Sequence, residues 1–184
     1  MGTPKEPKPA KYFVGLLSSH SELLASVETD LAAIFGAIDE RSETLPWNCS
    51  RFYEEEMGSQ LLRRFVSFHP LASPGKLADV KLATQHVEEK YRSQTADRPG
   101  RSVNLDPGYL EAGKVVLAST KNASQRIYLR AGVFAEATLL YHDGVFHGSS
   151  YTYQDYLWPE TLSFLTCLRS IYLAQLKQLG ELAG

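Results

Sequence analysis

The chain has 184 residues, which is enough for one domain with a sizeable hydrophobic core. Its composition, with 43% hydrophobic and 22% charged residues, is typical of a soluble globular protein. The net charge of -2 argues against general binding to nucleic acid or to an anionic membrane surface.

The chain starts with a segment rich in proline and lysine. Residues 1–10 are therefore expected to form a flexible arm, and residues 11–184 a single α+β domain. The apolar run at 11–17 predicts a strand that is buried on both faces. A helix follows, because Ser19 and Glu22 have the spacing of a capping box and Gly36 is a suitable stop. Its apolar face is Leu23, Leu24, Val27, Leu31, Ile34, Phe35 and Ile38.

The middle of the chain predicts two further strands and a second helix. The weaker strand is TLPWNCSRFY (44–53), with a bend at Pro46, and it leads into an acidic turn, EEEMG. The next strand is LLRRFVSF (61–68). Ser73 as N-cap and Pro74 at the first helical position then begin a helix. Its inward residues are Leu77, Val80, Val87 and Tyr91.

The second half is predicted to be mostly strand. A linker at 93–100, a candidate sub-boundary, precedes a strand at 101–106 that ends in a Pro107-Gly108 turn. Three more strands follow; a turn at Ala131-Gly132 joins the last two into a hairpin, and Asp143-Gly144, directly after them, is the strongest hairpin signal in the chain. They cover residues 114–119, 126–130 and 133–141, and a last helix runs from about Pro159 to Leu179.

The order of these elements indicates the fold class. The first hundred residues or so run β-α-β-β-α-β, which is the ferredoxin-like pattern of an antiparallel sheet with two helices on one face. Additional antiparallel strands and a C-terminal helix extend this core. The sequence therefore predicts an extended ferredoxin-like α+β protein.

The cysteines and the hydropathy indicate a cellular compartment. Cys49 and Cys167 have neither the spacing of a metal site nor that of a disulfide framework, and free thiols are typical of a reducing cytosol. The first residues do not resemble a signal peptide. No stretch approaches the roughly 18 apolar residues that a membrane helix requires. We expect a cytoplasmic protein with no membrane partner.

Motifs for common chemistries are missing from the sequence. Neither the Walker pattern nor G-x-G-x-x-G occurs, and H-E-x-x-H and G-x-S-x-G are also absent. His142 and His147 flank the Asp143-Gly144 turn, which would pair His142 with Val145. The two imidazoles are then expected in offset positions, as surface residues and not as a metal pair.

Six segments together are similar to a bacterial family filed as domain of unknown function 4416. They are FYEEEMG (52–58), LLRRFVSF (61–68), VNLDPGYL (103–110), VLASTKNASQRIYL (116–129), AEATLLY (135–141) and YTYQDY (151–156). Members are often labelled "GTP-binding protein", so the resemblance implies a nucleotide ligand. Gln125 stands where the family favours histidine, which argues against a role for an imidazole there.

Several polar residues interrupt the predicted strands. Asn104 and Asp106 share one face of an extended segment. They either stabilise the following turn, with Tyr109 packed over it, or face a pocket. Glu136 interrupts an apolar strand and requires a cationic partner, for which Arg126, Arg64 and Lys121 are the candidates. Glu136 is then either one half of a structural ion pair or a general base.

Other segments supply candidate ligand contacts. Arg126 could hold a phosphate bidentately with Lys121 as a second cation, or the loop that carries them is simply solvated. Arg63 and Arg64 are adjacent in a predicted strand, so only one of them points inward. Arg64 is expected to be that residue, because Leu62 and Val66 share its face. Tyr153 could stack on a base or sugar, or pack ahead of the last helix.

A magnesium site is the remaining candidate. If EEEMG is extended, Glu54 and Glu56 point the same way and could bind Mg²⁺ together with Asp106. A solvated acidic turn is the alternative.

Two functions of different classes fit these observations. The first is binding of a phosphorylated or nucleotide-like small molecule, with Asp106 and Glu136 as candidate catalytic groups. The second is a non-catalytic interaction module, in which the polar residues form a structural network. A sheet edge or the last helix would then contact a partner, such as a second copy of the chain.

Overall fold

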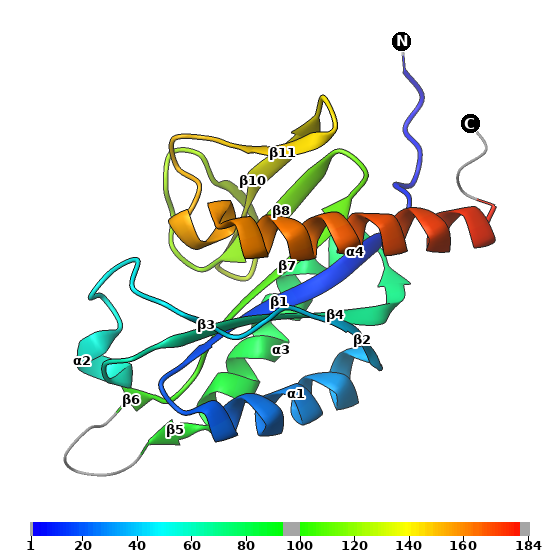
Figure 1. The fold of residues 1–184 in the computed structure, drawn as a ribbon. Helices are drawn as coiled ribbons and strands as arrows, with labels where there is room; N and C mark the ends of the chain where they lie inside the picture. Colours follow the sequence, from blue (N-terminus) through cyan, green and yellow to red (C-terminus); the bar gives the residue numbers. More distant parts are fainter. Residues whose placement is uncertain (1, 94–99, 181–184) are drawn as a thin grey trace.

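The computed structural model describes residues 2–93 and 100–180. They form a mixed α/β structure around a nine-stranded antiparallel sheet with the order β11-β10-β8-β7-β1-β4-β2, where β3 pairs with β4 and β9 with β10. Helix α4 crosses one face of the sheet, and α1 and α3 lie against the other (Figure 1). The helices are α1 (Ser21–Phe35), α2 (Glu54–Met57), α3 (Leu77–Lys90) and α4 (Pro159–Gln178).

The sheet is built mainly from long strands. They are β1 (Ala10–Ser18), β2 (Ile38–Arg41), β3 (Leu45–Pro46), β4 (Leu62–Ala72), β7 (Asn104–Glu111), β8 (Lys114–Ser119), β9 (Ile127–Arg130), β10 (Val133–His142) and β11 (Val145–Gly148). A separate two-stranded sheet pairs β5 (Arg92–Ser93) with β6 (Gly100–Arg101). The predicted sub-boundary at 93–100 lies almost entirely outside the described residues.

Both faces of the sheet are buried, because each is covered by helix. Alternate residues of the central strands point to opposite sides. Val14, Leu16 and Val66 pack in the core beneath α1 and α3, whereas Phe13 and Phe65 pack beneath α4. Every residue of β1 is buried, as the sequence predicted for this run.

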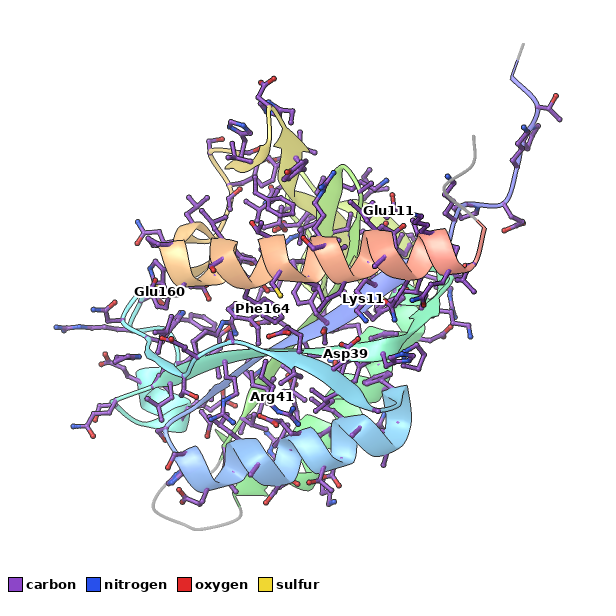
Figure 2. The ribbon with its side chains drawn as sticks, turned by 45° about the vertical axis from the view of Figure 1, so that its right-hand side comes forward. Lys11, Asp39, Arg41, Glu111, Glu160 and Phe164 are labelled. Carbon is purple, nitrogen blue, oxygen red and sulfur yellow. The ribbon has the colours of Figure 1, made fainter. Side chains whose placement is uncertain are left out.

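A buried ion pair lies in the layer beneath α4. Lys11 of β1, whose side chain is fully buried, bonds to Asp39 of β2 and donates to Gln175 Oε1 of α4 at 3.0 Å. The hydroxyl of Ser67 donates to the same aspartate at 2.7 Å. Figure 2 labels Lys11 and Asp39 together with Phe164, which belongs to the apolar part of this layer. The pair links β1, β2 and α4.

The first helix begins and ends differently from the capping-box prediction. Its N-cap is His20, with no side-chain cap, and the hydroxyl of Ser19 donates to the carbonyl of Met57 instead. The stop at Gly36 is confirmed by a φ of 97°. Ile38 lies beyond this stop and begins β2.

The second strand was predicted in the wrong place. It is Ile38–Arg41, whereas the predicted segment 44–53 contains only the two-residue strand β3. The acidic block EEEM forms a short helix and not a turn. The Ser73 cap is confirmed: its hydroxyl accepts from the amide of Gly75, in a 3-10 turn (Pro74–Lys76) that leads into α3.

The predicted turn at Pro107-Gly108 is also wrong, because β7 runs straight through both residues. Pro107 pairs with Val14 and Gly108 with Phe13. A Cβ on Gly108 would lie 2.6 Å from the carbonyl oxygen of Val116, so glycine is required here by close packing against β8. The composition of a turn therefore marks a crowded strand position.

The strands after β7 follow the prediction closely. Ala131 and Asp143 have positive φ and begin the two expected hairpin turns. Helix α4 has Pro159 in its first turn, and it buries Leu165, Leu168, Tyr172 and Leu176. None of the helices in the described ranges combines the length and apolarity needed to span a membrane.

Candidate functional site

A cavity of about 470 Å³ opens where strands β7 and β8 separate. The two strands are paired from Gly108–Leu117 to Glu111–Lys114, and no pairing continues toward Asn104 and Ser119. The cavity lies between the diverging ends. Its lining residues come from β4, β7, β8, β10 and α3 and from the segments 47–53, 119–121 and 150–156.

Side chains of α3 form hydrogen bonds with the backbone of β7 at the end where β8 no longer pairs with it. The amide of Leu105 donates to Glu88 at 2.6 Å, and its carbonyl accepts from Lys81 Nζ at 2.7 Å. Burial raises the pKa of Glu88, against the opposing charge of Lys81. Without these two side chains, the exposed strand edge would leave buried backbone groups unpaired, which is costly. They make the gap between the strands a stable feature of the fold.

Arg63 of β4 is the central cation of the site. Its side chain is 5% exposed, and it forms ion pairs of 2.9 Å with both Asp106 of β7 and Asp155 of the segment before α4. The guanidinium lies 4.9 Å from the ring centroid of Phe65 and 5.7 Å from that of Tyr156. Although burial acts to lower the pKa of Arg63, the two aspartates raise it above its ordinary value.

Asp106 belongs to a chain of polar contacts that continues away from Arg63. Its Oδ1 accepts from Asn104 Nδ2 at 3.0 Å, and Asn104 Oδ1 accepts from Arg101 at 2.9 Å. Arg101 in turn forms two hydrogen bonds with the carboxylate of Glu56, at 3.0 and 2.9 Å. This pairing holds the pKa of Glu56 below its usual range.

The protonation of Asp106 follows from these contacts. Burial acts to raise its pKa, but the charges of Arg63 and Lys81 and its hydrogen bonds hold the pKa below the ordinary value. Asp106 is therefore an ionised carboxylate at neutral pH. A carboxylate this well stabilised is a poor general base, because it gains little by accepting a proton.

A second ion pair closes the opposite wall. Arg126 Nε lies 2.7 Å from Glu136 Oε2, and the two side chains are 6% and 1% exposed. The same guanidinium donates to Ser119 Oγ at 2.7 Å and to the hydroxyl of Tyr153 at 2.6 Å. It also donates to the carbonyl of Lys121 at 2.7 Å, so most of its donors are engaged within the protein.

The rest of the wall is rich in aromatic side chains. Six of them line the cavity: Trp47, Phe52, Tyr53, Tyr151, Tyr153 and Tyr156. Trp47 Nε1 donates to Asp155 at 3.2 Å, and Lys121 Nζ lies 4.1 Å from the ring centroid of Phe52. Lys121 forms no ion pair with any carboxylate in the described part of the chain, so its charge is available to a ligand.

Two buried polar atoms of cavity residues have no partner within the described structure. They are Nε of Arg63 and the hydroxyl of Tyr156. Burial raises the pKa of Tyr156 well above its ordinary value, so the hydroxyl is a neutral donor. An unpaired buried polar atom costs roughly 1–3 kcal/mol, so each of the two lowers the stability of the cavity wall.

A family model described as "Domain of unknown function (DUF4416)" matches residues 8–172. The chain belongs to this family. The resemblance seen in its sequence motifs is thereby confirmed. Searches among curated proteins and among solved structures give no match to this DUF4416 member.

Six residues predicted for the site of this DUF4416 protein line the cavity. Their side chains come from four separate segments of the chain, and the divergence of β7 and β8 brings them together. They are Asn104, Asp106, Lys121, Arg126, Glu136 and Tyr153. The predicted partnership of Glu136 with Arg126 is confirmed.

Arg64 and Tyr109 lie on the other face of the sheet. Arg64 bonds to Glu28 of α1 and to Thr44, both at 2.7 Å, and the neighbouring Arg63 enters the cavity in its place. Alternation was applied correctly, but both faces of β4 are buried, so apolar neighbours could not identify the cavity side. Tyr109 packs edge-on against Tyr12, with ring centroids 5.8 Å apart.

The proposed magnesium ligands do not come together. Glu54 and Glu56 lie on a short helix, so the extended geometry that would align them is wrong. Glu56 is engaged by Arg101, and Glu54 does not line the cavity. Within the described residues, Glu54, Glu56 and Asp106 do not form a group with ligand atoms close enough to share an ion.

Sequence reasoning missed three central residues: Arg63, Asp155 and Tyr156. Asp155 and Tyr156 belong to YTYQDY, which was singled out only for stacking. A usable signal was the aspartate itself, because an acid among aromatic residues is expected to be partly buried and then requires a cation. In the structure Asp155 is 3% exposed.

Proposed function

We propose that this protein binds a small, phosphorylated, nucleotide-like molecule in the cavity between β7 and β8. The observation that carries the proposal is the combination of six aromatic residues with Lys121, whose charge is not paired with a carboxylate in the described structure. Aromatic walls with a few converging polar groups are typical of small-molecule sites, and a volume of about 470 Å³ lies within their usual range.

The division of roles within the cavity supports this ligand class. Aromatic rings offer surfaces on which a base can stack, and Lys121 offers a point charge for phosphate. Arg126 and Arg63 are already paired with carboxylates, so they shape the site more than they neutralise a phosphate.

The geometry favours binding over catalysis. The two candidate catalytic carboxylates, Asp106 and Glu136, are each held by an arginine, and Asp106 is stabilised in its ionised form. Magnesium is not included in the proposal, because its expected ligands are dispersed. The assignment of GTP among nucleotides rests only on the label that the family carries.

Thermal unfolding with a panel of ligands tests the proposal. GTP, GMP, ATP and inorganic phosphate are added at millimolar concentration, with and without Mg²⁺. A ligand that binds only the folded state raises its stability, by about 2.7 kcal/mol when its concentration is 100 times Kd. We expect at least one nucleotide to raise Tm, and no shift with any member of the panel would overturn the proposal.

Two variants locate the binding site. Lys121→Ala is expected to abolish the ligand-induced rise in Tm while leaving the unliganded Tm unchanged, because Lys121 is exposed and without an ion pair in the described structure. Lys177→Ala removes an exposed lysine of α4, remote from the lining residues, and serves as the charge-matched control. Equal loss in both variants would indicate nonspecific attraction. The chain has two tryptophans, so in Trp158→Phe the fluorescence comes from Trp47 in the cavity wall. A change in this fluorescence on adding the ligand gives a direct second readout.

A second candidate function is an interaction module, possible because one edge of the sheet is apolar and exposed. Ile127, Tyr128 and Leu129 of β9 are 72%, 59% and 40% exposed, and β9 pairs only with β10 among the described strands. A second copy of the chain could pair with this edge. A concentration-dependent mass in light scattering that Tyr128→Lys abolishes would support it, and a monomer at all concentrations would exclude self-association.

We also propose the finer assignments of fold and compartment. A ferredoxin-like core is supported by the strand order β7-β1-β4-β2, with α1 connecting β1 to β2 and α3 connecting β4 to β7. An experimental structure that matches known ferredoxin-like domains would test it. A cytoplasmic location is supported by two free cysteines, and fractionation of the native cell would test it. A bacterial source is proposed from the family resemblance of the sequence motifs.

A further inference from the structure

The hairpin of β10 and β11 presents a second group of ligand-type side chains, separate from the cavity. Asp143 and Gly144 form its two-residue turn, with φ values of 50° and 84°. Positive φ at both positions is what a type I′ turn requires. This tight turn fixes the positions of the residues at the ends of the two strands.

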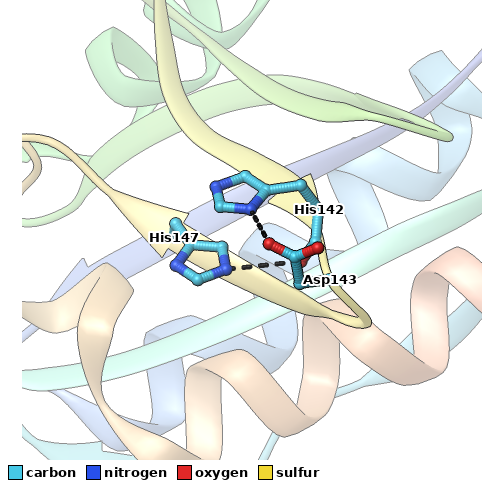
Figure 3. Close-up of side chains that lie close together, drawn as sticks. All are labelled: His142, Asp143 and His147. Atoms are coloured by element: carbon cyan, nitrogen blue, oxygen red, sulfur yellow. Dashed lines mark hydrogen bonds and ion pairs between the residues drawn. The ribbon is translucent and has the colours of Figure 1, made fainter.

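The hairpin register places two histidines on one face. His142 pairs with Val145 and His147 pairs with Leu140, so the histidines are diagonal neighbours. The predicted pairing with Val145 is confirmed, but the offset does not separate the imidazoles. Their rings stack with centroids 3.7 Å apart and planes within 4° (Figure 3).

Asp143 completes the group. Its Oδ2 lies 2.9 Å from Nδ1 of His142, and Nε2 of His147 lies 3.3 Å from the carbonyl oxygen of His142 (Figure 3). One ligand atom from each of the three side chains lies within 4.8 Å of the others. Across residues 2–93 and 100–180, no other group of three histidine, cysteine or acidic residues meets this criterion.

We propose that His142, Asp143 and His147 bind one divalent transition-metal ion of the zinc, copper or nickel type. Two imidazoles and a carboxylate suit these ions, whereas Mg²⁺ and Ca²⁺ prefer sites made of oxygen alone. The three ligands leave a coordination position open to water. The bound ion links β10, the turn and β11, and so clamps the hairpin.

The side chains have the freedom that binding requires. His142 and Asp143 are 55% and 89% exposed, so an ion reaches them directly from solvent. With Zn–N distances of about 2.0–2.1 Å, two tetrahedral ligand atoms lie roughly 3.3 Å apart. The imidazoles must therefore turn out of their stacked arrangement and close by no more than about 1.5 Å, which rotation of exposed side chains allows.

Calorimetric titration of the tag-free full chain with Zn²⁺ tests the proposal. One saturable site is expected, with a Kd below roughly 100 μM, which corresponds to a modest surface site. His142→Ala and His147→Ala should each weaken binding at least about tenfold, since even residues that only orient a ligand contribute that much. His86→Ala removes an exposed histidine of α3 and should change nothing.

A spectroscopic readout excludes an indirect effect of the variants. Zn²⁺ should shift the imidazole ¹⁵N signals of His142 and His147 and leave those of His69 and His86 in place, and excess Mg²⁺ should not compete. Wild-type affinity in both alanine variants, or no saturable site in the wild type, would overturn the proposal. The cavity ligand is not involved, so this outcome is independent of the proposed function.

Discussion

Arg63 on β4 and Asp106 on β7 form a 2.9 Å ion pair across β1, the strand that lies between them. In the register of the sheet, Gly15 of β1 stands opposite Asp106 on one side and Phe65 on the other. Because Gly15 has no side chain, the guanidinium of Arg63 can pass over β1 at this position and reach Asp106. Because Asp155 binds the same guanidinium, one buried cation joins three distant segments into the cavity wall.

The first prediction concerns Asp106→Asn and pH. The pKa of Asp106 in the folded state is below its ordinary value of 3.8. A depressed carboxyl pKa stabilises the fold above the unfolded pKa, and this stabilisation is lost as pH falls through the folded pKa. The wild type should exceed the variant by roughly 1–3 kcal/mol in the free energy of unfolding at pH 7. The difference should shrink below about pH 4.

Urea unfolding at several pH values measures this difference. Asp79→Asn is the control, because Asp79 pairs with Arg130 on the surface, where both side chains are more than half exposed. That variant should stay within about 0.5 kcal/mol of the wild type. If the deficit of Asp106→Asn were the same at pH 3 as at pH 7, the ionised carboxylate would not be its cause.

The second prediction concerns Gly15→Ala. A Cβ at this position would lie 2.9 Å from Cε1 of Phe65 and 3.2 Å from Cζ of Arg63. Both neighbours are buried and cannot withdraw freely, so overpacking should cost about 1–3 kcal/mol. Gly113→Ala is the matched control, because nothing lies within 4 Å of its Cβ. Equal stability of the two variants in urea would show that β1 yields easily at Gly15.

Much of the fold was predictable because its elements have strong local signals. The buried run of β1, the Ser73 cap of the 3-10 turn that leads into α3 and the Asp143-Gly144 turn all appear as expected. The position of the second strand was not predictable, since β2 has only four residues and Ile38 continues the apolar spacing of α1. The stop at Gly36 was the signal that should have ended the helix before Ile38.

The site was predictable where a residue broke the pattern of its strand. Asn104, Asp106 and Glu136 are polar in strands that are otherwise apolar, and all three line the cavity. Arg63 gave no such signal relative to Arg64, because β4 is buried on both faces and either arginine breaks the pattern equally. Only the tertiary position of α1, which supplies Glu28, directs Arg64 to the opposite face.

The third prediction concerns Tyr156→Phe in the absence of ligand. The hydroxyl of Tyr156 is fully buried and has no partner in the described structure. Its removal should leave the free energy of unfolding unchanged or raise it by up to about 1–3 kcal/mol. Tyr172→Phe is the control: this hydroxyl donates to the carbonyl of Pro9 at 3.0 Å, so its loss should destabilise by about 1 kcal/mol.

Urea unfolding of Tyr156→Phe and Tyr172→Phe in the absence of ligand measures this difference. Destabilisation of unliganded Tyr156→Phe comparable to that of Tyr172→Phe would contradict the prediction, because it would mean that the hydroxyl is already paired in the free protein.

The last prediction concerns the ion pair of Arg126 and Glu136. Glu136 is 1% exposed, and Arg126→Ala would leave its charge buried with two neutral donors, Gln125 Nε2 at 3.2 Å and Thr138 Oγ1 at 3.5 Å. Breaking a buried pair in this way should cost about 3–5 kcal/mol. Adding Glu136→Gln should recover part of that loss, because the orphaned charge is then removed. A double-mutant cycle in urea measures this coupling, and additive effects of the two changes would show that the pair contributes no net interaction.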